Sequence, residues 1–273
     1  MNFDNENTNV AWCPGCGNYL ILKTLKSALE ELNFTPQNTV MVSGIGQAAK
    51  MPQYINANYF NGLHGRAIPV ATGVKAANNE LNVVVTSGDG DIYGEGGNHL
   101  LHAIRRNPNI TVIVCNNMVY GLTKGQASPT ASFDYITKMQ PHGVKDEAFN
   151  PISLAISQNI SFVARAFCQD IEQTKDLMKQ AILHKGFSLL DIFQPCVTFN
   201  KINTYQWFKQ KTYYLEGEFD RVKAFGKSLE SENLPLGVFY KTQRPVFAEN
   251  IPSPLYKNEF KQEKLKELIN KYF

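Results

Sequence analysis

Residues 81–117 read LNVVVTSGDGDIYGEGGNHLLHAIRRNPNITVIVCNN. Two apolar, β-branched runs, 81–87 and 110–115, flank a glycine-rich turn and a segment, 99–106, that we predict to be helical. Strands that are apolar along their whole length are typical of parallel sheets covered by helices on both faces. This stretch therefore predicts a strand–helix–strand unit of a doubly wound α/β fold.

The same alternation continues on both sides of this unit. The pattern predicts helices over 18–33, 67–77, 151–158 and 171–184, and strands over 39–43, 161–166 and 187–193. We expect a mostly parallel sheet with helices on both faces. The predicted domains are 1–200, which contains the N-terminal cysteine motif and the ligand-binding domain, and 201–273, an irregular C-terminal extension that packs on the core or on a partner chain. A terminal helix is expected near 256–272.

Composition excludes several classes of protein. The chain has 273 residues, 43% of them apolar, and a net charge of only +3, so neither a disordered chain nor a nucleic-acid-binding surface is expected. No apolar run approaches the roughly 20 residues that span a bilayer, so no membrane partner is expected. The N-terminal ten residues are polar and acidic, unlike a signal or transit peptide. We therefore expect a soluble, cytoplasmic protein.

Polar side chains follow two neighbouring predicted strands at their carboxyl ends. Asp89 lies in a Gly-Asp-Gly turn after the first strand, and Asn117 follows the second. The carboxyl ends of parallel strands are where such folds bind ligands, and Mg²⁺ prefers hard oxygen donors shared with a phosphate. The backbone carbonyl of Val119 can complete the donor set. An isolated Gly-Asp-Gly is usually only a turn, but the joint pattern favours a magnesium–diphosphate site.

Further motifs follow in an order that resembles one family. The motifs are WCPGCG (12–17), GIG (44–46), HGRA (64–67), GGNH (96–99), RRN (105–107), YGLTKGQ (120–126), QPC (194–196) and NTY (203–205). Together with Gly-Asp-Gly and Asn-Asn, they resemble the β subunit of 2-oxoacid:ferredoxin oxidoreductases, which have a thiamine-diphosphate-binding fold.

The resemblance implies an activity and partners. Such enzymes convert a 2-oxoacid, here 2-oxoglutarate or pyruvate, with coenzyme A into acyl-CoA and CO₂, using thiamine diphosphate and Mg²⁺ and passing electrons to ferredoxin. The β chain is expected to be active only with an α subunit, which carries the glutamate that activates the cofactor. We therefore nominate no catalytic glutamate in this chain and interpret Glu95 as structural.

The resemblance also implies roles for individual residues. Asp89, Asn117 and Val119 would bind Mg²⁺. The cofactor would be lined by Ile45, Gly46, His64, Gly90, Asp91, Leu122 and Thr123. His64 would be the catalytic hydrogen-bond donor or proton carrier, although a capping or core histidine is the alternative. Lys50 and Lys124 are candidates on other grounds: both lie in turns after predicted strands, and a lysine near the cofactor could pair with a carboxylate of the 2-oxoacid. The alternative for both is a solvated surface lysine.

The cysteines suggest a second centre. By spacing alone, Cys13 and Cys16 suit zinc, an iron–sulfur cluster or thiol redox chemistry. The resemblance implies a [4Fe–4S] cluster on Cys13, Cys16, Cys196 and a third-position cysteine, but here that position is Gln47. A cluster with a non-cysteine ligand, a labile or different cluster, and no cluster all stay open. We interpret the other two cysteines, Cys115 and Cys168, as core residues.

Two alternative functions stay open at this point. The missing third cysteine favours a thiamine-diphosphate-dependent decarboxylase or synthase half that lacks an iron–sulfur cluster. A non-catalytic nucleotide-binding or assembly module is the other class. The segment that begins at Gly44 does not support it, because Gln47-Ala48-Ala49 breaks the G-x-G-x-x-G spacing of a dinucleotide site.

Overall fold

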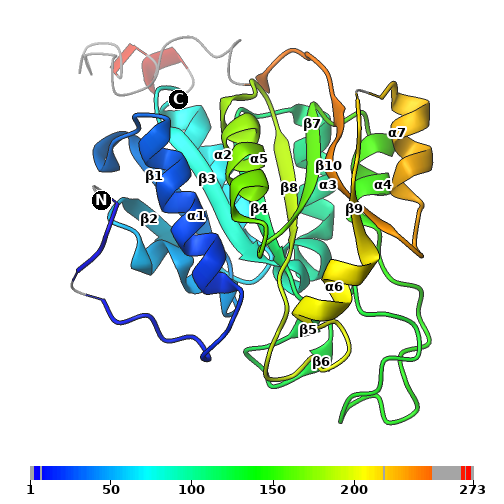
Figure 1. The fold of residues 1–273 in the computed structure, drawn as a ribbon. Coiled ribbons are helices and arrows are strands. Elements are labelled where there is room, and N and C mark those ends of the chain that lie inside the picture. Colours follow the sequence, from blue (N-terminus) through cyan, green and yellow to red (C-terminus); the bar gives the residue numbers. More distant parts are fainter. Residues whose placement is uncertain (1–2, 7, 218, 248–265, 268, 272–273) are drawn as a thin grey trace.

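The computed structural model describes residues 3–6, 8–217, 219–247, 266–267 and 269–271. The strands are β1 (Thr39–Ser43), β2 (Asn58–Asn61), β3 (Asn82–Gly88), β4 (Thr111–Asn116), β5 (Val119–Tyr120), β6 (Gln126–Ala127), β7 (Phe162–Phe167), β8 (Ser188–Phe193), β9 (Thr212–Tyr214) and β10 (Leu234–Lys241). The main sheet has the order β2-β1-β3-β4-β8-β7-β10-β9, and β5 pairs with β6 apart from it (Figure 1).

Helices cover both faces of this sheet. They are α1 (Asn18–Glu31), α2 (Ala67–Ala77), α3 (Gly97–Arg106), α4 (Pro151–Ser157), α5 (Ile171–Leu183), α6 (Tyr205–Lys211) and α7 (Arg221–Ser228), with the short turns η1 (Pro36–Asn38), η2 (Ala48–Tyr54) and η3 (Gly90–Glu95). In Figure 1, α1 and α5 lie in front of the sheet and α3 lies behind it. No helix among the described residues has the length and apolarity needed to cross a membrane.

The strands are apolar on both faces because each face packs against a separate core. Val84 and Ile113 belong to the core that contains residues of α1 and α5. Val85 and Val112 point the other way, into the core that contains residues of α2, α3 and α4. The predicted strand–helix–strand unit is confirmed, with β3 and β4 parallel and Val85 opposite Val112.

The expectation of an irregular tail after residue 200 is wrong for the described residues up to 241. They form α6, β9, α7 and β10, and β10 joins the main sheet antiparallel to β7, with Val238 opposite Ala164. The physical reason is burial, since Leu236 of β10 packs into one core and Phe239 into the other. The expected helix at 256–272 lies mostly outside the described residues, although 266–267 and 269–271 are helical. The domain division at residue 200 stays a prediction.

Candidate active site

A cavity of about 80 Å³ lies at the carboxyl ends of β1, β3 and β4. Parallel neighbouring strands bring these three ends to the same edge of the sheet, so the loops that follow them meet. All of the residues predicted to line the cofactor or to bind magnesium are among the residues that line this cavity: Ile45, Gly46, His64, Asp89, Gly90, Asp91, Asn117, Val119, Leu122 and Thr123. The structure thus brings the predicted set together, while the individual roles stay predictions.

Asp91 holds the walls of the cavity together. Its buried Oδ1 atom accepts hydrogen bonds from the backbone N–H of Ile45 at 3.0 Å and of Gly65 at 2.8 Å. Its Oδ2 atom accepts one from the Ser87 hydroxyl at 2.7 Å. A Cβ atom at Gly44 would lie 2.1 Å from Oδ2, so only glycine fits there. One carboxylate therefore fixes the loops after β1 and β2 against the end of β3.

His64 lies at the rim of the cavity and is not a core residue. Its side chain is 38% exposed, and its Nδ1 atom lies 3.0 Å from Asp91 Oδ1 and 3.3 Å from Glu95 Oε2. The Tyr120 hydroxyl lies 3.4 Å from the same Glu95 oxygen, and its ring covers Gly90 so closely that a Cβ there would lie 2.2 Å from it. The imidazole of His64 therefore lies beside two carboxylates, and the centre of its ring lies 6.5 Å from that of the Tyr120 ring. Sequence reasoning had not singled out Tyr120 for this position.

Asp89 is a buried carboxylate held by two hydroxyl groups. Its Oδ2 atom accepts hydrogen bonds from Ser128 at 2.5 Å and from Thr130 at 2.6 Å, both in the segment after β6. Burial raises the pKa of Asp89 to about 6, although these bonds and one from the Asn117 backbone oppose the rise. A neighbouring cation favours the charged form of such a carboxyl group. The environment of Asp89 therefore suits a metal ligand.

Asn117 sits in a tight turn directly after β4. Its Oδ1 atom accepts a hydrogen bond from the Val119 N–H at 3.0 Å, and Met118 between them has a left-handed backbone with φ of 59°. Asp89, Asn117 and Val119 thus line the same cavity, and a carboxylate, an amide oxygen and a backbone carbonyl are donors of the kind that Mg²⁺ prefers. Among the described residues, no group of three or more His, Cys, Asp or Glu side chains could hold a metal ion. A magnesium ion bound by Asp89, Asn117 and Val119 would therefore need neutral oxygens and phosphate oxygens to complete its ligands.

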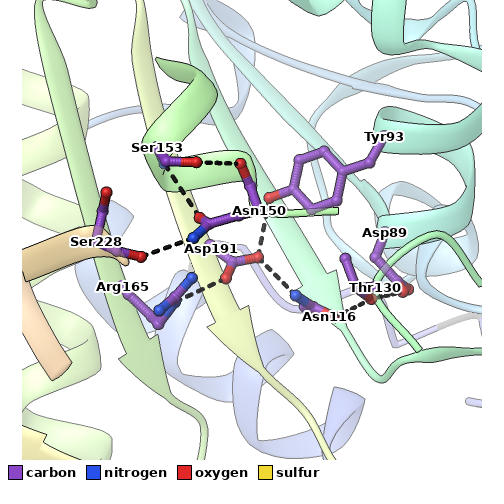
Figure 2. A network of polar contacts seen from close by, with 9 residues as sticks. All are labelled: Asp89, Tyr93, Asn116, Thr130, Asn150, Ser153, Arg165, Asp191 and Ser228. Carbon is purple, nitrogen blue, oxygen red and sulfur yellow. Dashed lines mark hydrogen bonds and ion pairs between the residues drawn. The ribbon is translucent and has the colours of Figure 1, made fainter. Parts of the chain in front are cut away.

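A buried polar network ties Asp89 to the middle of the sheet (Figure 2). Thr130 Oγ1 lies 2.9 Å from Asn116 Oδ1, and the Asn116 amide donates to Asp191 Oδ1 at 3.1 Å. The Tyr93 hydroxyl donates to the same Asp191 oxygen at 2.9 Å. Arg165 Nε pairs with Asp191 Oδ2 at 3.1 Å, and both side chains are buried. The segment that orients Asp89 is therefore anchored to the sheet.

Three of the five cysteines line a second cavity, of about 70 Å³. Cys13, Cys16 and Cys196 border it together with Gln47. The Trp12 indole N–H donates to the backbone oxygen of Gln47 at 2.8 Å, which holds the cysteine loop against the turn after β1. Burial raises the pKa of Cys16 to about 11, and the neighbouring Cys196 and Cys13 add to the rise. The predicted ligands are therefore brought together around Gln47.

The two cavities adjoin each other, and the other cysteines lie elsewhere. Gln47, Asn117 and Gly121 line both cavities. Cys115 and Cys168 are buried in the core, at 0% and 1% exposure, as predicted. A redox group on the three cysteines would therefore be a direct neighbour of the predicted cofactor.

The two lysines predicted to meet the substrate lie outside the first cavity. Neither Lys50 nor Lys124 is among the described residues that line it. Lys50 is partly buried within η2, and Lys124 is exposed in the turn between β5 and β6, with φ of 76°. Their predicted contact with a substrate carboxylate therefore finds no support in this chain by itself and stays a prediction.

Comparisons with known proteins agree with this geometry. Residues 37–192 match the family described as "Thiamine pyrophosphate enzyme, C-terminal TPP binding domain", and residues 196–254 match the C-terminal family of the pyruvate ferredoxin oxidoreductase beta subunit. A 2-oxoacid:ferredoxin oxidoreductase subunit beta from a Sulfolobus species is 43% identical over 90% of this chain and 87% of that protein. The chain belongs to this family of β subunits. The resemblance inferred from the motifs is thereby confirmed.

Other relatives extend the comparison of this β subunit. The 2-oxoglutarate oxidoreductase subunit KorB of Mycobacterium tuberculosis is 46% identical over 70% of this chain and 51% of that protein. Among solved structures, a 2-oxoglutarate:ferredoxin oxidoreductase from Magnetococcus marinus, with 2-oxoglutarate, coenzyme A and succinyl-CoA bound, superposes with a TM-score of 0.89 at 33% identity. That match covers 98% of this chain and 89% of the other. The doubly wound, thiamine-diphosphate-binding fold is therefore confirmed.

Proposed function

We propose that this β subunit, together with an α subunit, oxidatively decarboxylates a 2-oxoacid to acyl-CoA and CO₂ and passes the electrons to ferredoxin. The observation that carries the proposal is the single cavity in which Asp89, Asn117 and His64 meet at the carboxyl ends of neighbouring strands. We propose 2-oxoglutarate or pyruvate as the substrate. Relatives named for 2-oxoglutarate, one of them with 2-oxoglutarate bound, support the first.

In the proposed site, Asp89, the Asn117 amide oxygen and the Val119 carbonyl would hold Mg²⁺, which would offset the charge of the diphosphate of thiamine diphosphate. The bound cofactor supplies a nucleophilic carbon and an electron sink. The chain itself would orient the diphosphate end, and little water reaches Asp89 and Val119, which are each only 2% exposed. His64, whose Nδ1 atom lies close to the carboxylates of Asp91 and Glu95, would hold or move a proton at the rim.

We propose further that Cys13, Cys16 and Cys196 hold an iron–sulfur cluster. The three thiols line one cavity, which adjoins the cofactor cavity through Gln47 and Asn117. Thiolates of a cluster bind different iron atoms and so lie farther apart than the ligands of one metal ion, which is consistent with the absence of a compact metal-ligand group in the described part of the chain. Single electrons would then leave the cofactor by a short path.

A decarboxylase or synthase half without a cluster is the second candidate. The observation that favours it is Gln47 at the third ligand position, because an amide oxygen is a poor ligand for a cluster that thiolates normally hold. Retention of three thiols around one cavity favours the oxidoreductase.

We also propose a cytoplasmic location and the two-part division of the chain at residue 200. The five cysteines are free thiols in the structure, which suits a reducing compartment. In the proposed division, 1–200 carries both cavities and 201–273 packs on the core or on the α subunit.

Co-expression with the α subunit tests the proposed function. The anaerobically purified complex is expected to contain thiamine diphosphate, Mg²⁺ and iron. It should reduce a one-electron acceptor such as ferredoxin only when both a 2-oxoacid and coenzyme A are present. Release of CO₂ without reduction of the acceptor would favour the synthase alternative. A complex without bound thiamine diphosphate would contradict both.

The Thr130→Val variant is expected to weaken Mg²⁺-dependent binding of thiamine diphosphate about 10- to 100-fold, as is typical when a partner of a metal ligand is removed. Valine keeps the shape of threonine but cannot donate to Asp89, so the carboxylate loses one of its two hydroxyl partners. Calorimetric titration of the complex with Mg²⁺ at a fixed cofactor concentration measures the effect. Thr130→Ser, which keeps the hydroxyl group, should bind like the wild type. Equal affinities for all three proteins would refute this positioning role.

A further inference from the structure

Gln47, which lines the second cavity together with three cysteines, has a side-chain oxygen without a hydrogen-bond partner in the described part of the chain. The Oε1 atom of Gln47 is buried and has no hydrogen-bond partner among the described residues. Buried polar side-chain atoms nearly always have a partner, so this one requires an explanation. Gln47 lines the same cavity as Cys13, Cys16 and Cys196, and it also lines the adjoining cofactor cavity.

The position of Gln47 is fixed by contacts that do not use its side chain. Its backbone oxygen accepts from the Trp12 indole at 2.8 Å and from the Lys50 N–H at 3.3 Å. The neighbouring Gln194 donates its amide to Cys16 Sγ at 3.5 Å and to the Pro195 carbonyl at 2.9 Å. The side-chain amide of Gln194 therefore has hydrogen-bond partners, whereas the side-chain oxygen of Gln47 has none among the described residues.

We propose that the iron–sulfur cluster is held by three thiolates, from Cys13, Cys16 and Cys196, and that its fourth iron faces Gln47 Oε1 and is exchangeable. The inference rests on the cluster proposed above and deepens it. A neutral amide oxygen binds iron more weakly than a thiolate does, so the iron atom that faces Gln47 is lost more readily than the other three. The other three irons keep thiolate ligands.

We expect a one-electron oxidation of the cluster to release the iron atom that faces Gln47. One equivalent of ferricyanide takes one electron from the oxidised four-iron cluster and becomes ferrocyanide. The iron at Gln47 leaves as Fe²⁺, and its bonds to three sulfides break. All four sulfides and the three thiolates stay with a three-iron cluster. Added Fe²⁺ and a one-electron reductant such as dithionite reverse the step.

Electron paramagnetic resonance and iron analysis of the anaerobically purified α/β complex test the inference. On titration with ferricyanide, the wild type should lose one iron of the four and gain the signal of an oxidised three-iron cluster. The Gln47→Cys variant should keep its four irons at the same dose. Gln53→Cys adds a thiol at an exposed position of η2, the turn that begins directly after Gln47, and should behave as the wild type does.

The outcomes separate this inference from the proposed cluster. If the wild type contains iron but loses it no more readily than Gln47→Cys does, the exchangeable fourth iron is refuted, while the proposal of a cluster is retained. If the isolated complex contains no iron, the cluster itself is refuted. Isotopically labelled iron, added back to the oxidised wild type, gives a readout that needs no variant. Mössbauer spectra should show the label in a single site, and label spread over all sites would overturn the inference.

Discussion

The Asp89→Asn variant is expected to lower the affinity of the complex for thiamine diphosphate with Mg²⁺ by roughly a hundredfold or more, because removal of a direct ligand should exceed the effect of removing its partner. Asp89 is the one anionic donor in the proposed magnesium set, beside the Asn117 amide and the Val119 carbonyl. Asparagine keeps the size of the side chain and an oxygen that can accept from Ser128 or Thr130, so the fold should persist. Calorimetric titration with the cofactor measures the loss.

A matched control separates the metal role of Asp89 from a general effect of lost charge. Asp176 is an exposed aspartate of α5 that accepts a hydrogen bond from Gln180 at 2.6 Å. The Asp176→Asn variant makes the same chemical change far from the cavity and should bind the cofactor like the wild type. Unchanged cofactor affinity and activity in Asp89→Asn would show that Asp89 is not a magnesium ligand.

The Arg165→Met variant is expected to reduce the free energy of unfolding by about 3–5 kcal/mol, the usual cost of leaving a buried charge unpaired. Arg165 Nε lies 3.1 Å from Asp191 Oδ2, and Asp191 is fully buried. The guanidinium group also lies 4.9 Å from the centre of the Phe193 ring and 5.6 Å from that of Phe239. Methionine retains much of this apolar contact but supplies no charge. Urea unfolding of the purified chain measures the change.

A double variant tests whether the lost pairing causes this destabilisation. Asp191→Asn combined with Arg165→Met removes both charges and keeps an amide that can still bond Tyr93 and Asn116. Buried ion pairs replaced by neutral groups of similar volume are often tolerated, so the double variant should recover much of the lost stability. If it is as unstable as Arg165→Met, the loss comes from packing and not from the unpaired carboxylate.

The sequence alone predicts the centre of the site well. Asp89 and Asn117 each follow an apolar strand within a few residues, so the strands themselves fix where these side chains lie. Parallel pairing of β3 with β4 then puts the two strand ends together. Local chain geometry and one rule about parallel sheets were sufficient for this part of the cavity.

The residues that contact Asp89 and Gly90 from distant parts of the sequence could not be predicted in the same way. Ser128 and Thr130 reach Asp89 across 39 and 41 residues of sequence, and Tyr120 reaches Gly90 across 30. These contacts depend on the path of the loops around β5 and β6, which no periodic pattern specifies. The positions of such residues follow from tertiary packing.

The buried ion pair did leave a signal in the sequence. The runs FVARAF (162–167) and SLLDIF (188–193) each carry one charged residue inside an apolar strand. In the parallel sheet, Arg165 lies directly opposite Asp191. Because a lone buried charge is costly, opposite charges in two fully buried strands indicate that the strands are neighbours in this register.

Manganese anomalous scattering shows whether Asp89 and Asn117 bind one metal ion together. Mn²⁺ accepts the same oxygen donors as Mg²⁺, so it can replace it in crystals of the α/β complex grown with thiamine diphosphate. We expect one manganese peak at coordination distance, about 2.0–2.3 Å, from oxygens of both Asp89 and Asn117, beside the diphosphate. A cofactor-bound manganese that contacts neither residue would contradict the proposed site.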